Sequence, residues 1–405
     1  MLVKALEGVR VIDFTFHIMG PYATQILADM GADVIKIEAP WGDSSRSRKK
    51  EDLKGFAVSF LATNRNKRSM ILNLKDQKAV EIVKQLVKES DIVVENFRPG
   101  TLERLGLDYD ALKEVNPRIV YASLTGFGQF GPYKNRASFD QIAQASSGWM
   151  HLSSYGGTPT SVAGSPGDTV TATMATIGIL AALNQARTTG NGQHVDVAQM
   201  DTLFSLVPVP MMNYFLYKGD VFGINPNPEA VAEPPYPTVT FPLTRIRGTY
   251  PTKDGYVAVS ALLRYTDVFF KLVGADIPSV LEDWTENKSI SVESYILVID
   301  WIKSMTTEEA MALFNKHNMP AAPVNTFETL EKEPQFTERE MLFEYSHPEG
   351  FSYQAIGNPI KLSESPFEVY LPPPTLGEHT VEVLSSILGY SEEKIKALRN
   401  EKVIV

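Results

Sequence analysis

The sequence predicts an α/β fold with a doubly wound, mainly parallel sheet in a large domain and a second, smaller α/β domain. The first half of the chain alternates strand-like and helix-like segments, the pattern of successive β-α-β units. The chain has 405 residues, of which 43% are hydrophobic, whereas a single core stops growing at about 250–300 residues. A proline-rich stretch at residues 219–244 therefore marks a boundary between two domains.

The first β-α-β unit is predicted from three consecutive segments. Residues 9–14 predict a buried strand, residues 21–30 a helix with Pro21 at its first position, and residues 33–38 the next strand. The pattern continues with a helix at residues 76–90 and strands at residues 91–97 and 118–124. In a sheet of this kind, ligands are expected at the carboxyl ends of the strands.

The domain organisation follows from the proline-rich stretch. We expect a large domain whose N-terminal part is residues 1–220, a linker at 221–244, a small domain at 245–330, and a segment at 331–405 whose C-terminal helices complete the large domain. In the small domain, residues 255–260 predict a strand, and Thr306 begins a helix with a capping-box pattern.

Composition excludes several kinds of chemistry. The chain has no cysteine, which rules out disulfides, thiolate metal sites and a cysteine nucleophile. Its six histidines show no metal-ligand spacing, and a net charge of −10 disfavours nucleic acid as a partner. The N-terminal segment carries charges, and no apolar run reaches the roughly 18 residues of a membrane span. A cytoplasmic protein with neither a metal nor a membrane partner is therefore expected.

One segment is basic although the chain is acidic. Residues 46–75 contain nine Lys or Arg against two acidic residues. Such a segment either concentrates a small polyanion, such as a nucleotide or a coenzyme, or forms a solvated loop. A G-x-G-x-x-G pattern at residues 126–131 is followed by Pro132 rather than by a helix, which argues against a dinucleotide fingerprint.

Asp168 is the candidate catalytic residue. It follows a turn containing Gly164, Pro166 and Gly167, and it precedes a long run of good helix formers. These features predict that Asp168 is the helix N-cap, where free N–H groups keep a carboxylate ionised. An oriented, ionised carboxylate can act as a covalent nucleophile. The alternative is that Asp168 only caps the helix.

Taken together, these residues give a sequence that resembles the family III CoA-transferases. The segments that carry the resemblance are residues 6–14, 20–21, 27–38, 96–100 with Arg104, 116–128, 167–168, 189–193 and 376–380. The resemblance implies a Rossmann-like large domain, a small domain and an intertwined homodimer. It also implies that Asp168 forms aspartyl anhydride and aspartyl-CoA thioester intermediates, with CoA thioesters as substrates and no tightly bound cofactor.

The resemblance assigns CoA contacts by position. The implied CoA-binding residues are Ile18, Met19, Ala39, Leu72, Asn73, Leu74, Lys75, Asn96, Phe97, Arg98, Arg104, Arg136, Ala137 and Asp140. Formyl-CoA transferase has glutamine, arginine and lysine where this chain has Ile18, Ala39 and Ala137. We therefore expect a larger or partly apolar acyl group, with succinyl-CoA as the donor, rather than formate and oxalate.

Two other functions remain open. An α-methylacyl-CoA racemase shares the fold, but its acid/base histidine is replaced here by Phe139, which cannot move a proton. A non-catalytic CoA-binding subunit of a heteromeric transferase would need no nucleophile, and the retention of Asp168 argues against it.

Overall fold

The structure is a computed structural model that describes residues 4–46, 53–153, 158–217, 246–261 and 264–405. The contacts divide the chain into two compact units. Unit 1 comprises Met1–Pro208 and Gln335–Val405, and unit 2 comprises Val209–Pro334. The linker expected at residues 221–244 lies outside the described residues.

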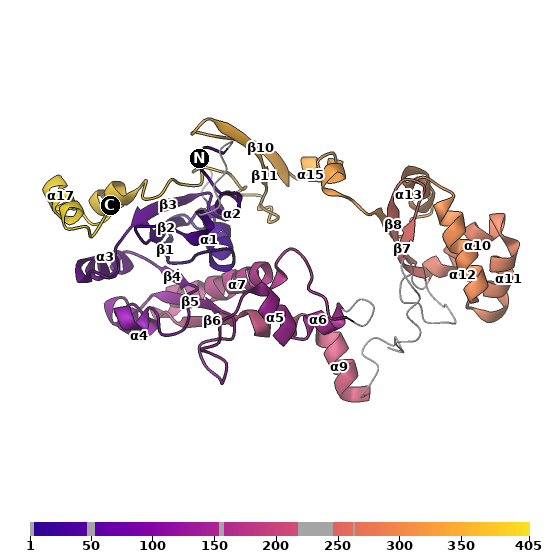
Figure 1. Cartoon of the computed structure of the whole chain (residues 1–405), viewed down its shortest axis with the longest axis horizontal. Helices are drawn as coiled ribbons and strands as arrows, with labels where there is room; N and C mark the ends of the chain where they lie inside the picture. The colour runs from indigo at the N-terminus through magenta and orange to yellow at the C-terminus, as the bar shows by residue number, and fades with distance from the viewer. Residues whose placement is uncertain (1–3, 47–52, 154–157, 218–245, 262–263) are drawn as a thin grey trace. The chain divides into compact units, whose positions relative to one another are not determined.

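Unit 1 is built on a six-stranded parallel sheet, so the expectation of a mixed α/β fold with a parallel sheet is confirmed (Figure 1). The strand order is β3-β2-β1-β4-β5-β6, which places a topological switch point between β1 and β4. The strands are β1 (Arg10–Asp13), β2 (Asp33–Glu38), β3 (Lys67–Ile71), β4 (Ile92–Glu95), β5 (Val120–Thr125) and β6 (His194–Ala198).

Helices cover both faces of this sheet. Because successive side chains of a strand point to opposite faces, Val11 and Ile12 enter different hydrophobic clusters. The Val11 face packs against α1 (Met19–Asp29) and α7 (Pro166–Thr189). The Ile12 face packs against α3 (Gln77–Lys88), α4 (Tyr109–Val115), α16 (Thr380–Ser386) and α17 (Glu392–Asn400). Segments far apart in the sequence thus close one core.

The remaining elements of unit 1 are short. They are the 3-10 helices η1 (Ser44–Arg46) and η2 (Glu103–Leu105), the helices α2 (Val58–Thr63), α5 (Asp140–Ser146), α6 (Trp149–Leu152) and α8 (Gln199–Ser205), and the antiparallel hairpin of β10 (Leu342–His347) and β11 (Phe351–Ile356).

Within the six-stranded sheet and its first helix, the observed elements match most of the predicted ones, with one shifted boundary and two strands missed. α1 begins at Met19, so Pro21 is its third residue and not its first. β3 was missed because it contains Lys67 and Arg68, and a charged segment does not resemble a buried strand. β6 was missed because His194 and Asp196 interrupt its apolar residues.

Unit 2 contains a three-stranded antiparallel sheet in the order β7-β8-β9, packed against helices. The capping box predicted at Thr306 is present at the start of α13. The elements are α9 (Pro208–Tyr217), which begins at the boundary, β7 (Ile246–Pro251), β8 (Tyr256–Ala261), α10 (Arg264–Asp276), α11 (Pro278–Asn287), α12 (Val292–Lys303), α13 (Thr307–Lys316), β9 (Ala321–Pro323), α14 (Phe327–Leu330) and α15 (Pro334–Glu338), which ends in unit 1. In the described part of the chain, no helix has both the length and the apolar character needed to cross a membrane.

Candidate functional site

Two cavities lie at the carboxyl ends of the central strands, next to the topological switch point of the sheet. The larger has a volume of about 830 Å³ and the smaller about 260 Å³. Phe16, His17 and Phe97 line both cavities. Open α/β sheets bind ligands at this place because the loops there diverge and leave a crevice. The two cavities together are therefore the candidate active site.

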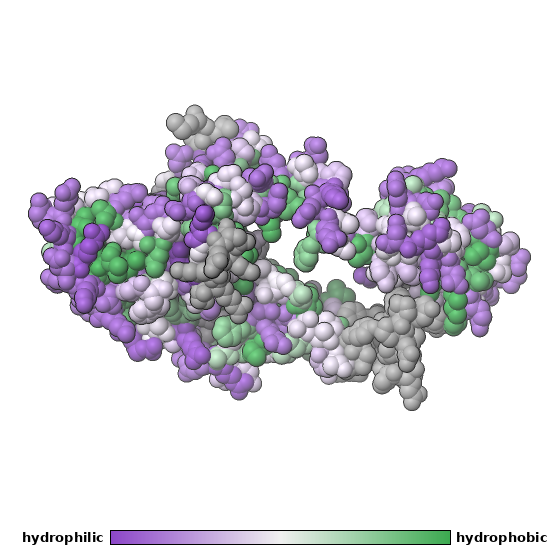
Figure 2. Space-filling model, turned by 45° about the horizontal axis from the view of Figure 1, so that its top comes forward, coloured by the Kyte–Doolittle hydropathy of each residue, from purple (hydrophilic) through white to green (hydrophobic). Residues whose placement is uncertain are grey.

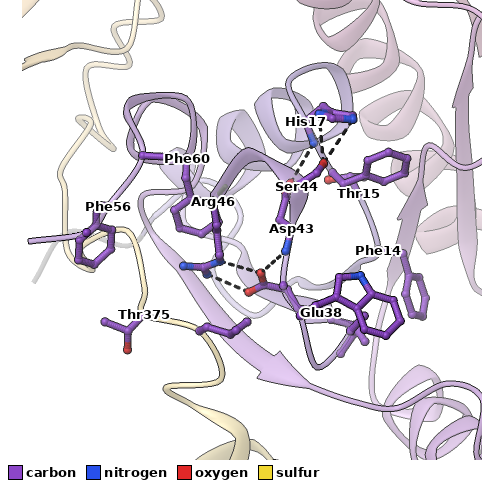
Figure 3. Close-up of a pocket in the computed structure, with 18 of the residues that line it drawn as sticks. Phe14, Thr15, His17, Glu38, Asp43, Ser44, Arg46, Phe56, Phe60 and Thr375 are labelled. Atoms are coloured by element: carbon purple, nitrogen blue, oxygen red, sulfur yellow. Dashed lines mark hydrogen bonds and ion pairs between the residues drawn. The ribbon is translucent and has the colours of Figure 1, made fainter. Parts of the chain in front are cut away.

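The larger cavity has aromatic walls and one ion pair (Figure 3). Nε and Nη2 of Arg46 donate to the two carboxylate oxygens of Glu38, at 2.8 and 2.9 Å. The aromatic rings that line this cavity belong to Phe14, Phe16, His17, Trp41, Phe56, Phe60 and Phe97. Flat apolar walls with a cation at the edge suit a ligand that carries both a ring system and negative charge.

Buried charges hold the loops that line the larger cavity. Nζ of Lys36 lies 2.9 Å from Oδ2 of Asp43 and donates to the main-chain oxygen of Thr15 at 2.6 Å. Nζ of Lys67 lies 3.1 Å from Oδ2 of Asp13. Burial outweighs this attraction and lowers the pKa of Lys67 to about 8. The contacts of Lys36 thus hold the loops after β1 and β2, and the pair of Lys67 and Asp13 joins β3 to β1. Removing one partner of either pair would leave an uncompensated buried charge.

Asp168 lies in the first turn of α7, and its side chain lines the smaller cavity. The expectation that Asp168 is the helix N-cap is wrong. The N-cap is Ser165, whose φ is +51°, and Pro166 occupies the first helical position. Proline is suited to that position because its φ is already helical and it lacks an N–H group. The helix therefore starts earlier and places Asp168 third.

The surroundings of Asp168 make its carboxyl group a weaker acid than expected. Burial and the neighbouring carboxylate of Asp140 raise the pKa of Asp168 to about 6, while a hydrogen bond from Gln199 opposes that rise. We expected the free N–H groups of an N-cap to keep this carboxylate ionised, whereas burial and Asp140 here favour its protonated form. At pH 7 and above the carboxylate is nevertheless largely ionised, although it is partly buried.

Asp140 and Gln199 hold Asp168 from two sides. Oδ1 of Asp140 accepts a hydrogen bond from the main-chain N–H of Gly167 at 2.7 Å, which orders the turn just before Asp168. Nε2 of Gln199 donates to Oδ1 of Asp168 at 2.7 Å. Among the described residues, Oδ2 of Asp168 has no hydrogen-bond partner. The free oxygen is therefore available to a substrate.

The structure brings part of the predicted CoA-binding set to these cavities. Ala39 lines the larger cavity, and Phe97 lines both. Asn96 also ties β4 to the loop after β1, since its amide exchanges two hydrogen bonds with the main chain of Phe16, at 3.0 and 2.9 Å. The predicted residues that line the smaller cavity with Asp168 are Met19, Asn96, Phe97, Arg98 and Arg136.

Other predicted residues line neither cavity. Leu72 is fully buried in the core, and its main-chain N–H donates to the main-chain oxygen of Glu38. Lys75 is exposed, and its ammonium lies 5.9 Å from the ring centroid of Trp41, which does line the larger cavity. Asp140 acts through Gly167 rather than at the cavity wall. The predicted residues outside both linings are Ile18, Leu72, Asn73, Leu74, Lys75, Arg104, Ala137 and Asp140.

Two site residues were missed by reasoning from the sequence. Gln199 is the first residue of α8, directly after β6. A polar residue at the carboxyl end of a parallel strand was the available signal, but β6 itself was not predicted. His17 lines both cavities with a positive φ of +65°, which is uncommon for a residue other than glycine and often occurs at functional sites.

No metal site is found in the residues that the structure describes, since no three His, Asp or Glu side chains are grouped to hold an ion.

Comparisons with known proteins agree with one another. The sequence profile of CoA-transferase family III matches residues 6–380. The chain is 34% identical to a formyl-CoA:oxalate CoA-transferase of Streptomyces coelicolor, with 100% of both chains covered. It is 31% identical to a protein of the same name from Rhodopseudomonas palustris, with 98% of this chain and 97% of the relative covered.

Solved structures share the fold of the chain. A CaiB/BaiF family protein from Brucella suis superposes with a TM-score of 0.80 and is 29% identical, covering 95% of this chain and 99% of that protein. Rv3272 from Mycobacterium tuberculosis superposes with a TM-score of 0.78 and is 27% identical, covering 94% of this chain and 99% of its own.

Proposed function

The chain belongs to CoA-transferase family III, and we propose that Asp168 is the nucleophile with which it moves CoA from an acyl-CoA donor to a carboxylic acid. The position, hydrogen bonding and acidity of this carboxylate support the role. It lines a cavity at the switch point of the sheet, one oxygen is held by Gln199, and its pKa is raised to about 6. A poorly solvated carboxylate that is still ionised at neutral pH is a competent nucleophile.

The proposed reaction proceeds by attack of nucleophiles on carbonyl carbons. The Asp168 carboxylate attacks the donor thioester, the C–S bond breaks, and CoA leaves as a thiolate, which gives a mixed anhydride. The thiolate attacks the aspartyl carbonyl carbon and expels the donor acid as a carboxylate, which gives an aspartyl-CoA thioester. The acceptor carboxylate then displaces the thiolate from this carbon. Finally the thiolate takes the acceptor acyl group and Asp168 becomes a carboxylate again. None of these steps requires a proton, so only the ionised form of Asp168 is active.

We place CoA across the two cavities. The larger cavity, of about 830 Å³, is within the range of cofactor sites, and its aromatic walls suit an adenine ring. The smaller cavity is lined by Arg98, Lys134 and Arg136, cations that suit phosphates or a substrate carboxylate. Because the cavities share Phe16, His17 and Phe97, one extended thioester can reach Asp168 from the larger cavity.

We propose succinyl-CoA as the donor and a larger or partly apolar acid as the acceptor. Ile18 and Ala39 replace polar residues of formyl-CoA transferase, and Ala39 lines the larger cavity. The Streptomyces and Rhodopseudomonas relatives are nevertheless named for formyl-CoA and oxalate. A panel that pairs formyl-CoA or succinyl-CoA with oxalate and with larger dicarboxylic acids separates the two choices.

We propose that the protein is a homodimer. Patches of hydrophobic residues interrupt the hydrophilic surface in the view of Figure 2. On α9, Val209, Met212, Phe215 and Leu216 are each more than half exposed. Such a row of large apolar side chains is typical of a surface that another protein chain covers. Replacing Phe215 and Leu216 by Asp should lower the mass measured by light scattering from that of a dimer to that of a monomer.

A racemase is the rival enzyme, and one contact bears on it. The ring of His17 lies edge-on to Phe139, at a centroid distance of 6.0 Å, and lines the same cavity as Asp168. A histidine is thus near the position where racemases carry one, although it comes from another segment. Exchange of deuterium into the acyl α-carbon without CoA transfer would establish the racemase instead.

Intact-protein mass spectrometry tests the proposed function directly. The purified chain is mixed with succinyl-CoA, with and without hydroxylamine, and compared with the variants Asp168→Ala and Asp201→Ala. Asp201 is an exposed carboxylate in the first turn of α8 and serves as the matched control. An acyl or CoA adduct that forms on the wild type and on Asp201→Ala, but not on Asp168→Ala, supports the nucleophile. Turnover of Asp168→Ala at the wild-type rate would end the proposal, and an inert wild type would favour the non-catalytic subunit.

A further inference from the structure

The side chain of Gln199 is fixed between two partners. It is 3% exposed, and its Nε2 donates to Oδ1 of Asp168 at 2.7 Å. On the other side, its Oε1 accepts a hydrogen bond from the hydroxyl of Ser138 at 3.2 Å. An ionised carboxylate can only accept hydrogen bonds, so the NH₂ group of Gln199 must face Asp168 and its oxygen must face Ser138. The amide therefore has one defined orientation.

Ser138 reaches Gln199 because the loop after β5 comes very close to it. A Cβ atom at Gly126 would lie 2.1 Å from Cβ of Ser138, so only glycine allows this approach. The main-chain oxygen of Gly126 also accepts a hydrogen bond from the N–H of Met200, the residue after Gln199, at 3.1 Å. The loop thus supports both the side chain of Gln199 and the start of α8.

We infer that the side-chain amide of Gln199 is the hydrogen-bond donor that stabilises the oxyanion formed on Oδ1 of Asp168 when a thiolate or carboxylate attacks the aspartyl carbonyl carbon. This inference rests on the proposed function. Oδ2, which has no hydrogen-bond partner among the described residues, forms the bond to the acyl group. Oδ1 then becomes the carbonyl oxygen of the anhydride and of the thioester.

The charge on Oδ1 changes during the reaction, so this hydrogen bond is stronger in one state than in the others. In the free carboxylate Oδ1 carries about half a negative charge, and in the acylated enzyme it is a neutral carbonyl oxygen. When CoA thiolate adds to the aspartyl carbon, the C=O electron pair moves onto Oδ1 as a full negative charge, and collapse expels the acid with Oδ2. A donor fixed 2.7 Å away binds this state most strongly.

In the first step, the attack of Asp168 on the donor thioester, the hydrogen bond to Oδ1 does not help the reaction. When Oδ2 attacks the donor thioester, Oδ1 loses charge, and the new oxyanion forms on the substrate oxygen instead. Gln199 stabilises the reactant of that step and not its transition state. Removing the amide should therefore slow attack on the aspartyl carbon while leaving formation of the anhydride as fast or slightly faster.

The test follows both covalent species in time. Wild type, Gln199→Met and Gln199→Ala are each mixed rapidly with succinyl-CoA and no added acceptor, then quenched for intact-protein mass spectrometry. In both variants we expect the CoA adduct to form about 10²–10³-fold more slowly, as when an oxyanion donor is lost, and the acyl adduct to accumulate. Ser138→Ala should show the same change to a smaller degree, because the amide stays but loses its orientation.

Gln185→Met is the matched control. Gln185 is exposed on the helix that carries Asp168, and among the described residues its side chain bonds only Gln193. Formation of the CoA adduct at the wild-type rate in Gln199→Met would overturn the inference. Equal slowing of both adducts would also overturn it, because that result means a purely structural role. A wild type that forms neither adduct would overturn the proposed function and this inference with it.

Discussion

Oδ1 of Asp140 lies 2.7 Å from the main-chain nitrogen of Gly167, the residue immediately before Asp168. A Cβ atom at position 167 would lie 2.8 Å from the same oxygen, so the contact depends on glycine. The carboxylate that orders this turn is also the charge that helps to raise the pKa of Asp168. One residue therefore orders the turn before the proposed nucleophile and, after burial, contributes most to its raised pKa.

Asp140→Asn should lower the pKa of Asp168. The amide oxygen of asparagine can still accept from Gly167, but the negative charge that raises the Asp168 pKa is gone. In the wild type, kcat/KM should fall below about pH 6 as Asp168 becomes protonated. In the variant, this acidic limb should move to lower pH. An unchanged limb would show that another group controls it.

Asp140→Ala provides the structural comparison. It removes the same charge but also the acceptors for the N–H of Gly167 and for Nε2 of Gln144. We expect it to lower the free energy of unfolding by about 2–4 kcal/mol, the cost of two donors that lose this acceptor. Urea denaturation should show a smaller loss in Asp140→Asn, which keeps the acceptor for Gly167 but not the one for Gln144.

Asp168→Asn should stabilise the folded protein at neutral pH while abolishing transfer. The pKa of Asp168 is raised from 3.8 in the unfolded chain to about 6 in the folded one. Between these values the folded state binds more protons, so the wild type loses stability as the pH rises from about 4 to 6. The uncharged variant avoids this loss, which solvent screening of a half-buried group limits to about 1–2 kcal/mol.

Thermal unfolding across pH checks this prediction. The melting temperature of Asp168→Asn should exceed that of the wild type at pH 7, and the difference should disappear below pH 4. Asp168→Ala should fold and keep its oligomeric state but form no covalent adduct. A variant less stable than the wild type at pH 7 would contradict the raised pKa.

Gly126→Ala should reduce activity through Ser138. The added methyl group would lie 2.1 Å from Cβ of Ser138, so the loop must move away from Gln199. We expect kcat to fall by at least tenfold with a smaller change in KM, and stability to fall by about 1–3 kcal/mol, as for other overpacked sites. In the double variant with Ser138→Gly the space returns, so stability should recover while kcat stays low.

Arg98→Ala should weaken CoA binding more than Arg104→Ala does. Arg98 lines the smaller cavity, whereas Arg104 lies on η2 and lines neither cavity. The resemblance implies that both residues contact CoA. Comparing the two variants therefore tests whether a residue must also line the cavity to bind CoA. KM for the acyl-CoA should rise by about tenfold in Arg98→Ala, the loss of one charge-assisted hydrogen bond. Equal effects would mean that CoA extends to η2.

Much of the large unit's sheet could be predicted because its strands are locally apolar. The strand predicted at residues 33–38 coincides with β2, and that predicted at residues 9–14 contains β1. The same reasoning missed β3, since Lys67 is fully buried only because Asp13, from another strand, neutralises it. The hydrophobic periodicity of a sequence cannot show that a lysine is buried when the residue that pairs with it lies far away along the chain.

In the candidate site, too, local sequence features identify one residue, whereas the contacts of its partners depend on the fold. Asp168 could be identified because glycine and proline force a turn before a long helix, which is a local property of the sequence. Its partners Asp140 and Gln199 lie 28 and 31 residues away along the chain, in α5 and α8. Folding alone brings them within hydrogen-bond distance of residues 167 and 168.

The sequence by itself determined the family, most strands of the parallel sheet and the carboxylate that we propose as nucleophile, because composition, turn residues and local periodicity are properties of neighbouring residues. The tertiary structure decided where the helix begins, that the pKa of Asp168 is raised rather than lowered, and that Gln199 faces Oδ1. Acidity and hydrogen-bond geometry depend on burial and on charges that are close only in space.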